Sequence, residues 1–371
     1  MSNIPVNEHG DLRYPINDGR DMSDFRMETF SGYKKTDVKK ELLQNISNNK
    51  IEPACYWSAE LICSGHFGDV WEIAIFYLGK HIYNGNPKVA IYLQKRFQIF
   101  RNIMIQGMYT DELVLRNNKT IRDLFAEIMV VLVSNPKKSG FELLKINKEE
   151  EFDMTQMPER LKASSAEFAI PIMHKKDPKE IFIAINEFTY HICTDTEHKS
   201  NMVQACYWLE WIIEFDLICK KRKVKCLCDR RYDIPVEAKY QCDIIWVVWD
   251  ALFSVANTRE QASFISTVLS AILDLFCIRF TSSCTKKRRY LLYFAISMLC
   301  EPFCTDQELV PDKGFLQNTL MHLPTIYKTI KESEVRPKTD YLFAGFEDQT
   351  NTEKSKQKME WMNSVDLWSS G

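Results

Sequence analysis

The tetrapeptide Ala-Cys-Tyr-Trp occurs twice in this chain, at residues 54–57 and 205–208. A glutamate follows each copy within three residues, Glu60 in the first and Glu210 in the second. Identity over four residues is weak evidence of duplication, but tryptophan and cysteine are rare enough to make the match informative. The repeat indicates two related units, and both tandem duplication and chance recurrence remain open explanations.

The segments that follow each copy strengthen this interpretation, because they come in the same order. A tryptophan-anchored apolar segment is followed by a long amphipathic stretch and then by a shorter apolar helix. In the first half these are residues 71–78, 88–105 and 121–133, and in the second half 245–252, 259–280 and 290–300. Each segment has an apolar face at helical spacing, and stacked units of this kind bury a shared face. The sequence therefore predicts two helical bundle units.

Composition supports an all-α fold. The chain has only 12 Gly and 13 Pro among 371 residues, and these helix breakers are scarce where helices run long. Hydrophobic residues make up 45% and charged residues 26%, as in ordinary globular proteins. The most apolar window, 262–280, has serines and Asp274 along one side and ends with Arg279, so we expect a core helix and no membrane partner.

Several helix starts are visible. Acceptor side chains followed three residues later by a polar or acidic residue predict starts at Asp69, Thr120 and Thr258. Asp177-Pro178 predicts another start. The following residues, 181–185, are rich in isoleucine, so a strand remains an alternative there.

These signals divide the chain into five parts. Residues 1–36 are polar and lack periodicity, and we expect a disordered arm. The first helical unit is predicted over 37–134 and the second over 200–332. Between them, 135–199 is expected to form a connector with a short helix or strand, and 333–371 a flexible tail.

The twelve cysteines favour a reducing intracellular location, because the first residues are polar and acidic and no secretory signal is expected. Three of them, Cys219, Cys226 and Cys228, lie within ten residues amid positive charge. One interpretation is a zinc site completed by Cys242 or His191, since neighbouring cations favour thiolates. The other is a solvated loop after a helix, because Cys-x-Cys is a poor zinc spacing. No other cofactor is predicted.

Two basic clusters suggest a surface for nucleic acid. The first lies near the cysteines and the second at an expected helix start, where cations oppose the helix dipole and favour a bound anion. A net charge of −2 excludes a globally basic nucleic-acid binder but allows such patches. The cations are Lys220, Lys221, Arg222, Lys223, Lys225, Arg230 and Arg231 in the first cluster, and Lys286, Lys287, Arg288 and Arg289 in the second.

The polar C-terminal segment contains two tryptophans, Trp361 and Trp368. Their spacing, with Ser364, would bring them to one helical face, as in a peptide that docks in a groove. Docking to a partner and folding back onto the chain are both open.

Several stretches resemble a family encoded by large nucleocytoplasmic DNA viruses of protists and algae. They include Tyr56-Trp-Ser-Ala-Glu-Leu-Ile-Cys-Ser-Gly-His-Phe and Lys286-Lys-Arg-Arg-Tyr-Leu-Leu-Tyr-Phe-Ala, and the similarity spans about residues 55–343. The resemblance implies a place of action in the host cytoplasm, a viral factory or the virion, and it implies no activity.

No catalytic motif stands out, so we expect a non-enzymatic protein that uses its helical faces to bind a protein partner. The alternative is a nucleic-acid-binding accessory factor in viral replication or transcription that acts through the two basic clusters. Salt-dependent binding to DNA and RNA distinguishes these alternatives.

Overall fold

The computed structural model describes residues 13–107, 112–138, 142–147, 152, 157–194, 199–310 and 312–335. In these ranges the regular structure is helical and contains no strand, apart from an isolated antiparallel bridge between Glu28 and Lys34. The prediction of an all-α fold is confirmed. Its physical basis is the long apolar stripes at a 3.6-residue period, which are rarely interrupted by Gly or Pro.

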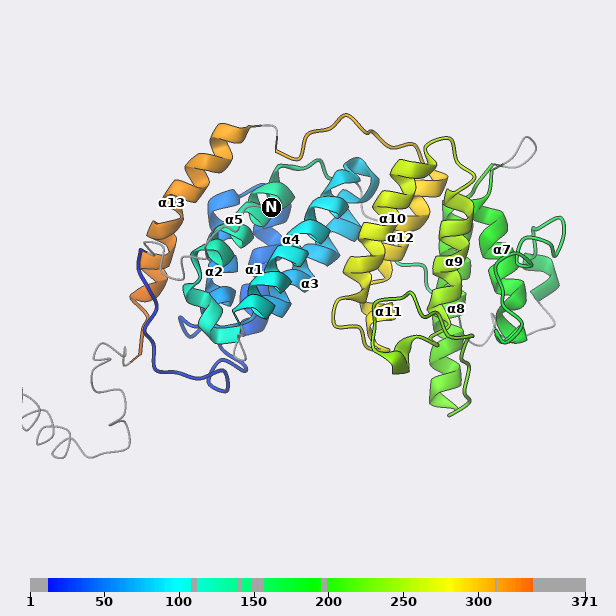
Figure 1. Ribbon diagram of the computed structural model, residues 1–371, viewed down its shortest axis with the longest axis horizontal. Coiled ribbons are helices and arrows are strands. Elements are labelled where there is room, and N and C mark those ends of the chain that lie inside the picture. The colour runs from blue at the N-terminus through cyan, green and yellow to red at the C-terminus, as the bar shows by residue number, and fades with distance from the viewer. Residues whose placement is uncertain are drawn as a thin grey trace, which may run out of the picture.

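The helices fall into two groups that lie side by side (Figure 1). The first group consists of α1 (Lys35–Ser47), α2 (Ile51–Cys63), α3 (Phe67–Tyr77), α4 (Lys88–Gln106) and α5 (Lys119–Ser134). The second consists of α7 (Phe182–Ile192), α8 (Met202–Lys221), α9 (Ile245–Ala256), α10 (Ala262–Cys277), α11 (Cys284–Lys287) and α12 (Arg289–Cys300). Between α3 and α4 the chain forms a π-helical turn, η1 (Leu78–Ile82), followed by a short 3₁₀ turn, η2 (Tyr83–Gly85).

The strand alternative for residues 181–185 is wrong: Ile181 ends the 3₁₀ turn η5 (Lys179–Ile181), and residues 182–185 begin α7, which pairs closely with α8. β-branched residues lower helix propensity only slightly, and the apolar face buried in the α7–α8 hairpin outweighs that preference. Within the region expected to be a connector, α7 therefore belongs to the second group.

The pattern of packing in the first group recurs in the second. The hairpin of α1 and α2 has a counterpart in α7 and α8, and α2 packs on α5 as α8 packs on α12. The repeated tetrapeptide lies in the matching helices α2 and α8. Trp57 and Trp208, however, have unlike surroundings: Trp57 is half-buried against Tyr33, whereas Trp208 is 1% exposed. Tandem duplication therefore stays a prediction.

The N-terminal segment is not a loose arm over residues 13–34, contrary to expectation. Ile16, Phe25 and Phe30 are buried in the core, and the Phe30 N–H donates to Ser64 Oγ at 2.8 Å. The segment has no helical period because it consists of coil and turns, with a run of turns at residues 22–27. Its buried side chains recur at irregular intervals, and Phe25 stacks on Phe30 with ring centroids 6.1 Å apart, which periodicity cannot reveal. Residues 1–12 lie outside the described ranges.

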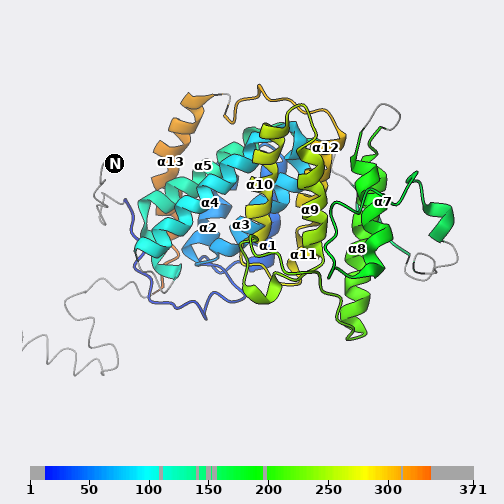
Figure 2. The same ribbon diagram turned by 45° about the vertical axis from the view of Figure 1, so that its right-hand side comes forward.

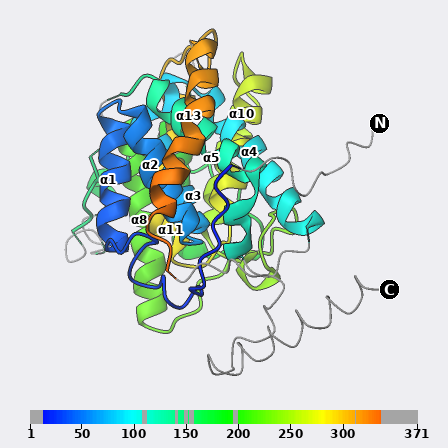
Figure 3. The same ribbon diagram turned by 90° about the vertical axis from the view of Figure 1, so that its left-hand side faces the viewer.

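The last described helix, α13 (Lys313–Lys331), returns to the first group, whereas we expected it to belong to the second unit. It packs on α2 and α5 (Figures 1 and 3), and Tyr327 is buried there with the Arg122 guanidinium 3.8 Å from its ring centroid. The segment between α12 and α13 is hydrogen-bonded to the first unit, since Asn135 Nδ2, at the end of α5, donates to the Leu309 carbonyl at 2.8 Å. The chain thus closes its first unit with its last helix.

Candidate functional site

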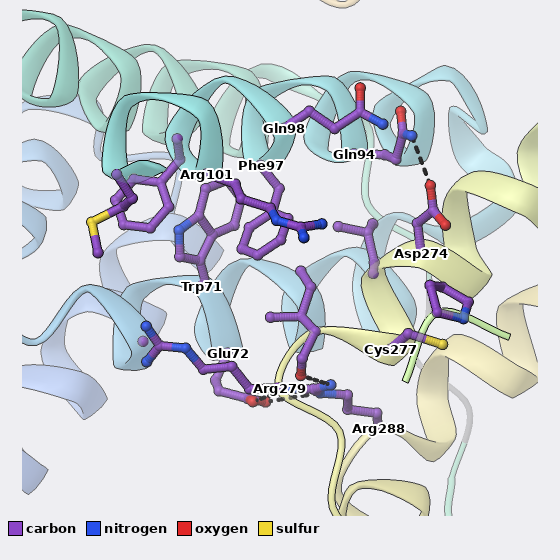
Figure 4. A pocket seen from close by; sticks show the side chains of 16 residues that line it. Trp71, Glu72, Gln94, Phe97, Gln98, Arg101, Asp274, Cys277, Arg279 and Arg288 are labelled. Carbon is purple, nitrogen blue, oxygen red and sulfur yellow. Dashed lines mark hydrogen bonds and ion pairs between the residues drawn. The ribbon is translucent and has the colours of Figure 1, made fainter. Parts of the chain in front are cut away.

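A cavity with aromatic and charged walls lies between the two helical groups, where α4 packs against α10. Its volume is about 440 Å³, within the range of ordinary ligand sites. Helices α3 and α4 form one wall and the end of α10 the other (Figure 4). Figure 2 shows α10 beside α4. The two units meet where α4 packs on α10 and where α12 packs on η1, and the cavity lies beside the α4–α10 contact.

Aromatic rings form the wall on the first unit. Trp71 from α3 contacts Phe97 and Phe100 from α4, with ring centroids 5.1 and 5.9 Å apart, and Phe125 from α5 at 5.4 Å. The Trp71 Nε1–H is buried and has no acceptor among the described residues. A buried indole N–H usually has a hydrogen-bond acceptor, so this part of the wall lacks an acceptor among the described residues.

The opposite side of the cavity is charged. Arg288 is 4% exposed, and its Nη1 donates to the carbonyls of Phe276 and Ile278 at 2.8 and 2.6 Å. Its guanidinium also forms an ion pair with Glu72 from α3. This arginine therefore joins the two units across the cavity. Gln94 Nε2 makes a second bridge by donating to Asp274 Oδ2 at 2.8 Å.

Two further arginines line the cavity. Arg279 follows α10 and forms an ion pair with Glu112. Arg101 projects from α4 on the same side as Trp71 (Figure 4). It is exposed and has no hydrogen-bond or ion-pair partner among the described residues. Sequence reasoning missed it, although an arginine spaced i, i+4 and i+7 with Phe97 and Met104 in an apolar stripe was a usable signal.

The two units also touch through their backbones. Gly79 in η1 faces the first turn of α12, and a Cβ built there would lie 2.7 Å from the carbonyl carbon of Tyr290. Only glycine permits this approach. The cavity therefore lies between elements that are held together by backbone contact as well as by side chains.

The structure divides the predicted basic residues into two classes. Arg231, Arg288 and Arg289 are buried and ion-paired, and Lys220 is paired with Asp216 and Asp243. Lys286 lies 3.6 Å from Glu214. Arg230 donates to Gln241. For the buried arginines the prediction of a nucleic-acid contact is wrong, because their charges are already neutralised inside the fold. Lys221, Arg222, Lys223, Lys225 and Lys287 are exposed.

Arg231 links the loop after α8 to the rest of the second unit. Its Nη1 and Nη2 donate to the Asp177 carboxylate at 2.7 and 2.8 Å, and its Nε to Asp250 at 2.9 Å. Burial alone would raise the pKa of Asp177. The hydrogen bonds from Arg231 and from the N–H groups of His174 and Asp229 outweigh burial and hold that pKa below its ordinary value.

A carboxyl whose pKa is lowered on folding contributes stability above its unfolded pKa, near 4, and loses it as pH falls through the folded value. We therefore expect Asp177→Asn to lower the free energy of unfolding by about 2 kcal/mol at pH 7. The variant and the wild type should converge below pH 4. Urea unfolding at pH 7, 4, 3 and 2 tests this, with the exposed Asp233→Asn as control. Parallel stability profiles across that range would contradict it.

The described residues do not form the zinc site that the sequence suggested. All twelve cysteines lie within the described ranges and are free, and no group of three or more His, Cys, Asp or Glu side chains there is placed to hold a metal. Cys228 instead donates to the Asp243 carbonyl at 3.2 Å. Burial raises the pKa of Cys226 to about 12 and also raises that of Cys219, so the nearby cations do not produce thiolates. His191 is paired with Glu187.

Trp361 and Trp368 lie outside the described residues. Of the helices that the structure describes, none has the length and apolar character needed to span a bilayer. No protein-family model, curated protein or solved structure matches this chain. The resemblance to a viral family therefore stays a prediction.

Proposed function

We propose that this protein is a non-enzymatic interaction protein whose inter-unit cavity docks a segment of a protein partner. The segment presents an apolar side chain flanked by a carboxylate. The observation that carries the proposal is Arg101, a cation at the rim of an aromatic cavity that has no partner among the described residues.

The chemistry of the cavity supports this occupant. Trp71, Phe97 and Phe100 offer an apolar wall for a side chain of the partner. Three arginines line the cavity. Arg288 is paired with Glu72 and Arg279 with Glu112, so Arg101 is the lining arginine that has no carboxylate partner among the described residues. A carboxylate can accept two parallel hydrogen bonds from that guanidinium.

The test is an array of short peptides in which one Trp, Phe or Leu is flanked either by Asp and Glu or by Lys and Arg. We expect the protein to prefer the acidic set. Arg101→Glu should weaken binding to that set by about 10- to 100-fold, the value of a charge-assisted hydrogen bond, and shift preference toward the basic set. The exposed Arg26→Glu is the matched control. Equal binding of both sets, or no effect of Arg101→Glu, would contradict the proposal.

The proposed place of action is intracellular and reducing. Twelve cysteines that are all free fit that setting, since an oxidising compartment favours disulfides. Labelling of the purified protein with a thiol reagent under denaturing conditions should count twelve thiols without prior reduction.

A further inference from the structure

A second surface goes beyond the proposed docking function. Lys221, Arg222, Lys223 and Lys225 are exposed at the C-terminal end of α8; we call these four residues the basic surface. The other cations of the first cluster have partners: Lys220 and Arg231 are ion-paired, and Arg230 donates to Gln241. We propose that the basic surface binds single-stranded nucleic acid.

Helix α11 lies beside α8, since Lys286 Nζ is 3.6 Å from Glu214 Oε1 (Figures 1 and 2). Lys287, the next residue, lies instead against α3, in a small hollow that Glu72 and Phe76 also line. The basic surface is therefore confined to the end of α8, where four cations within five residues can contact successive phosphates.

At the end of α8, the charged residue Lys223 has a backbone conformation that favours glycine. The N–H of Val224 donates to the Cys219 carbonyl at 2.9 Å and that of Lys223 to the Lys220 carbonyl at 3.2 Å. This is a Schellman ending, and Lys223 takes the left-handed position with φ +57°. Glycine would occupy that position without strain. The closed turn fixes the backbone from which these side chains project.

An aromatic side chain accompanies the charge. Tyr232 is 74% exposed, and the Arg230 guanidinium lies 4.7 Å from its ring centroid. The Tyr232 carbonyl accepts a hydrogen bond from Gln241 at 3.3 Å. Asp243, two residues after Gln241, accepts from Lys220 Nζ at 3.4 Å. Tyr232 thus lies beside the end of α8. An exposed ring next to cations is the arrangement on which unpaired bases stack, and duplexes offer no such bases.

Fluorescence anisotropy with a labelled 20-nucleotide oligothymidylate tests the proposal across a salt titration. Four phosphate contacts predict a slope of log affinity against log salt of about −2.8. Neutralising Lys221, Arg222, Lys223 and Lys225 to Gln should remove most of this slope. The matched control neutralises four exposed lysines of the other unit, Lys34, Lys40, Lys95 and Lys328, and should leave the slope unchanged. Equal effects of the two sets would overturn the proposal.

Two single substitutions separate binding from folding. Lys223→Gly relieves the left-handed lysine, so we expect an unchanged or higher melting temperature with a shallower salt slope. Tyr232→Ala should weaken oligothymidylate binding roughly tenfold and leave binding of inorganic polyphosphate, which has no bases, unchanged. Binding to vesicles with anionic headgroups but not to oligothymidylate would also overturn the proposal, as would equal affinity for duplex DNA.

Discussion

Arg289→Met is expected to destabilise the second unit by about 3–5 kcal/mol, the cost of removing one partner from a buried ion pair. Arg289 Nη1 donates to Glu210 Oε2 at 2.6 Å, and the Tyr293 hydroxyl donates to Glu210 Oε1 at 2.8 Å. Both Arg289 and Glu210 are buried. Burial raises the pKa of Glu210 even though Arg289 lowers it, so the carboxylate form would be still less stable without Arg289.

Urea unfolding at pH 7 measures this loss, with the exposed Arg26→Met as control. The double variant Arg289→Met, Glu210→Gln should recover part of it, because the uncompensated charge is then absent. The raised pKa of Glu210 means that its carboxylate costs stability as pH rises above its unfolded value, near 4.3. Arg289→Met should therefore be least destabilising in acid. A loss below 1 kcal/mol at pH 7 would show that the pair contributes little.

Gly79→Ala is expected to cost about 3 kcal/mol and to loosen the junction between the units. An added Cβ would meet the Tyr290 carbonyl carbon at 2.7 Å, its oxygen at 2.8 Å and the Leu291 nitrogen at 2.9 Å. These are backbone atoms at the start of α12, so no side-chain rotation relieves the overlap. The units must separate, and the cavity between them must change shape.

Chemical unfolding gives the loss in stability, and the peptide array gives the loss in docking. Gly68→Ala is the matched control for the unfolding measurement, because its Cβ would meet only the Arg279 side chain at an ordinary 3.5 Å. That substitution lies within α3 and should be neutral or slightly stabilising. If Gly79→Ala unfolds like Gly68→Ala, the backbone contact between η1 and α12 is not essential to the junction.

Periodicity predicted the helices well where one face of the helix is buried. The stretch 121–133 was expected to be helical, and α5 runs from Lys119 to Ser134. Its start was less well predicted, because Asn118 and not Thr120 caps the helix by accepting from the Ile121 N–H. Several neighbouring polar residues can cap a helix, and the choice depends on how the preceding turn packs.

The function of the charged residues could not be read in the same way. Arg288 looked like part of a surface cluster, but its partner Glu72 is 216 positions away in the chain. Arg101 looked like an ordinary helix residue, and it lies at the cavity only because α10 packs beside α4. A one-dimensional pattern records charge but not the distant group that neutralises it.

The return of α13 sets an order of events during synthesis. Helices α2 and α5 leave the ribosome long before Tyr327 and Ile330, which are buried against the first unit at the end of the chain. During that interval an apolar surface stays open to water and to neighbouring nascent chains. A truncated product that stops before Lys313 keeps this surface open permanently, so such fragments should depend on chaperones or aggregate.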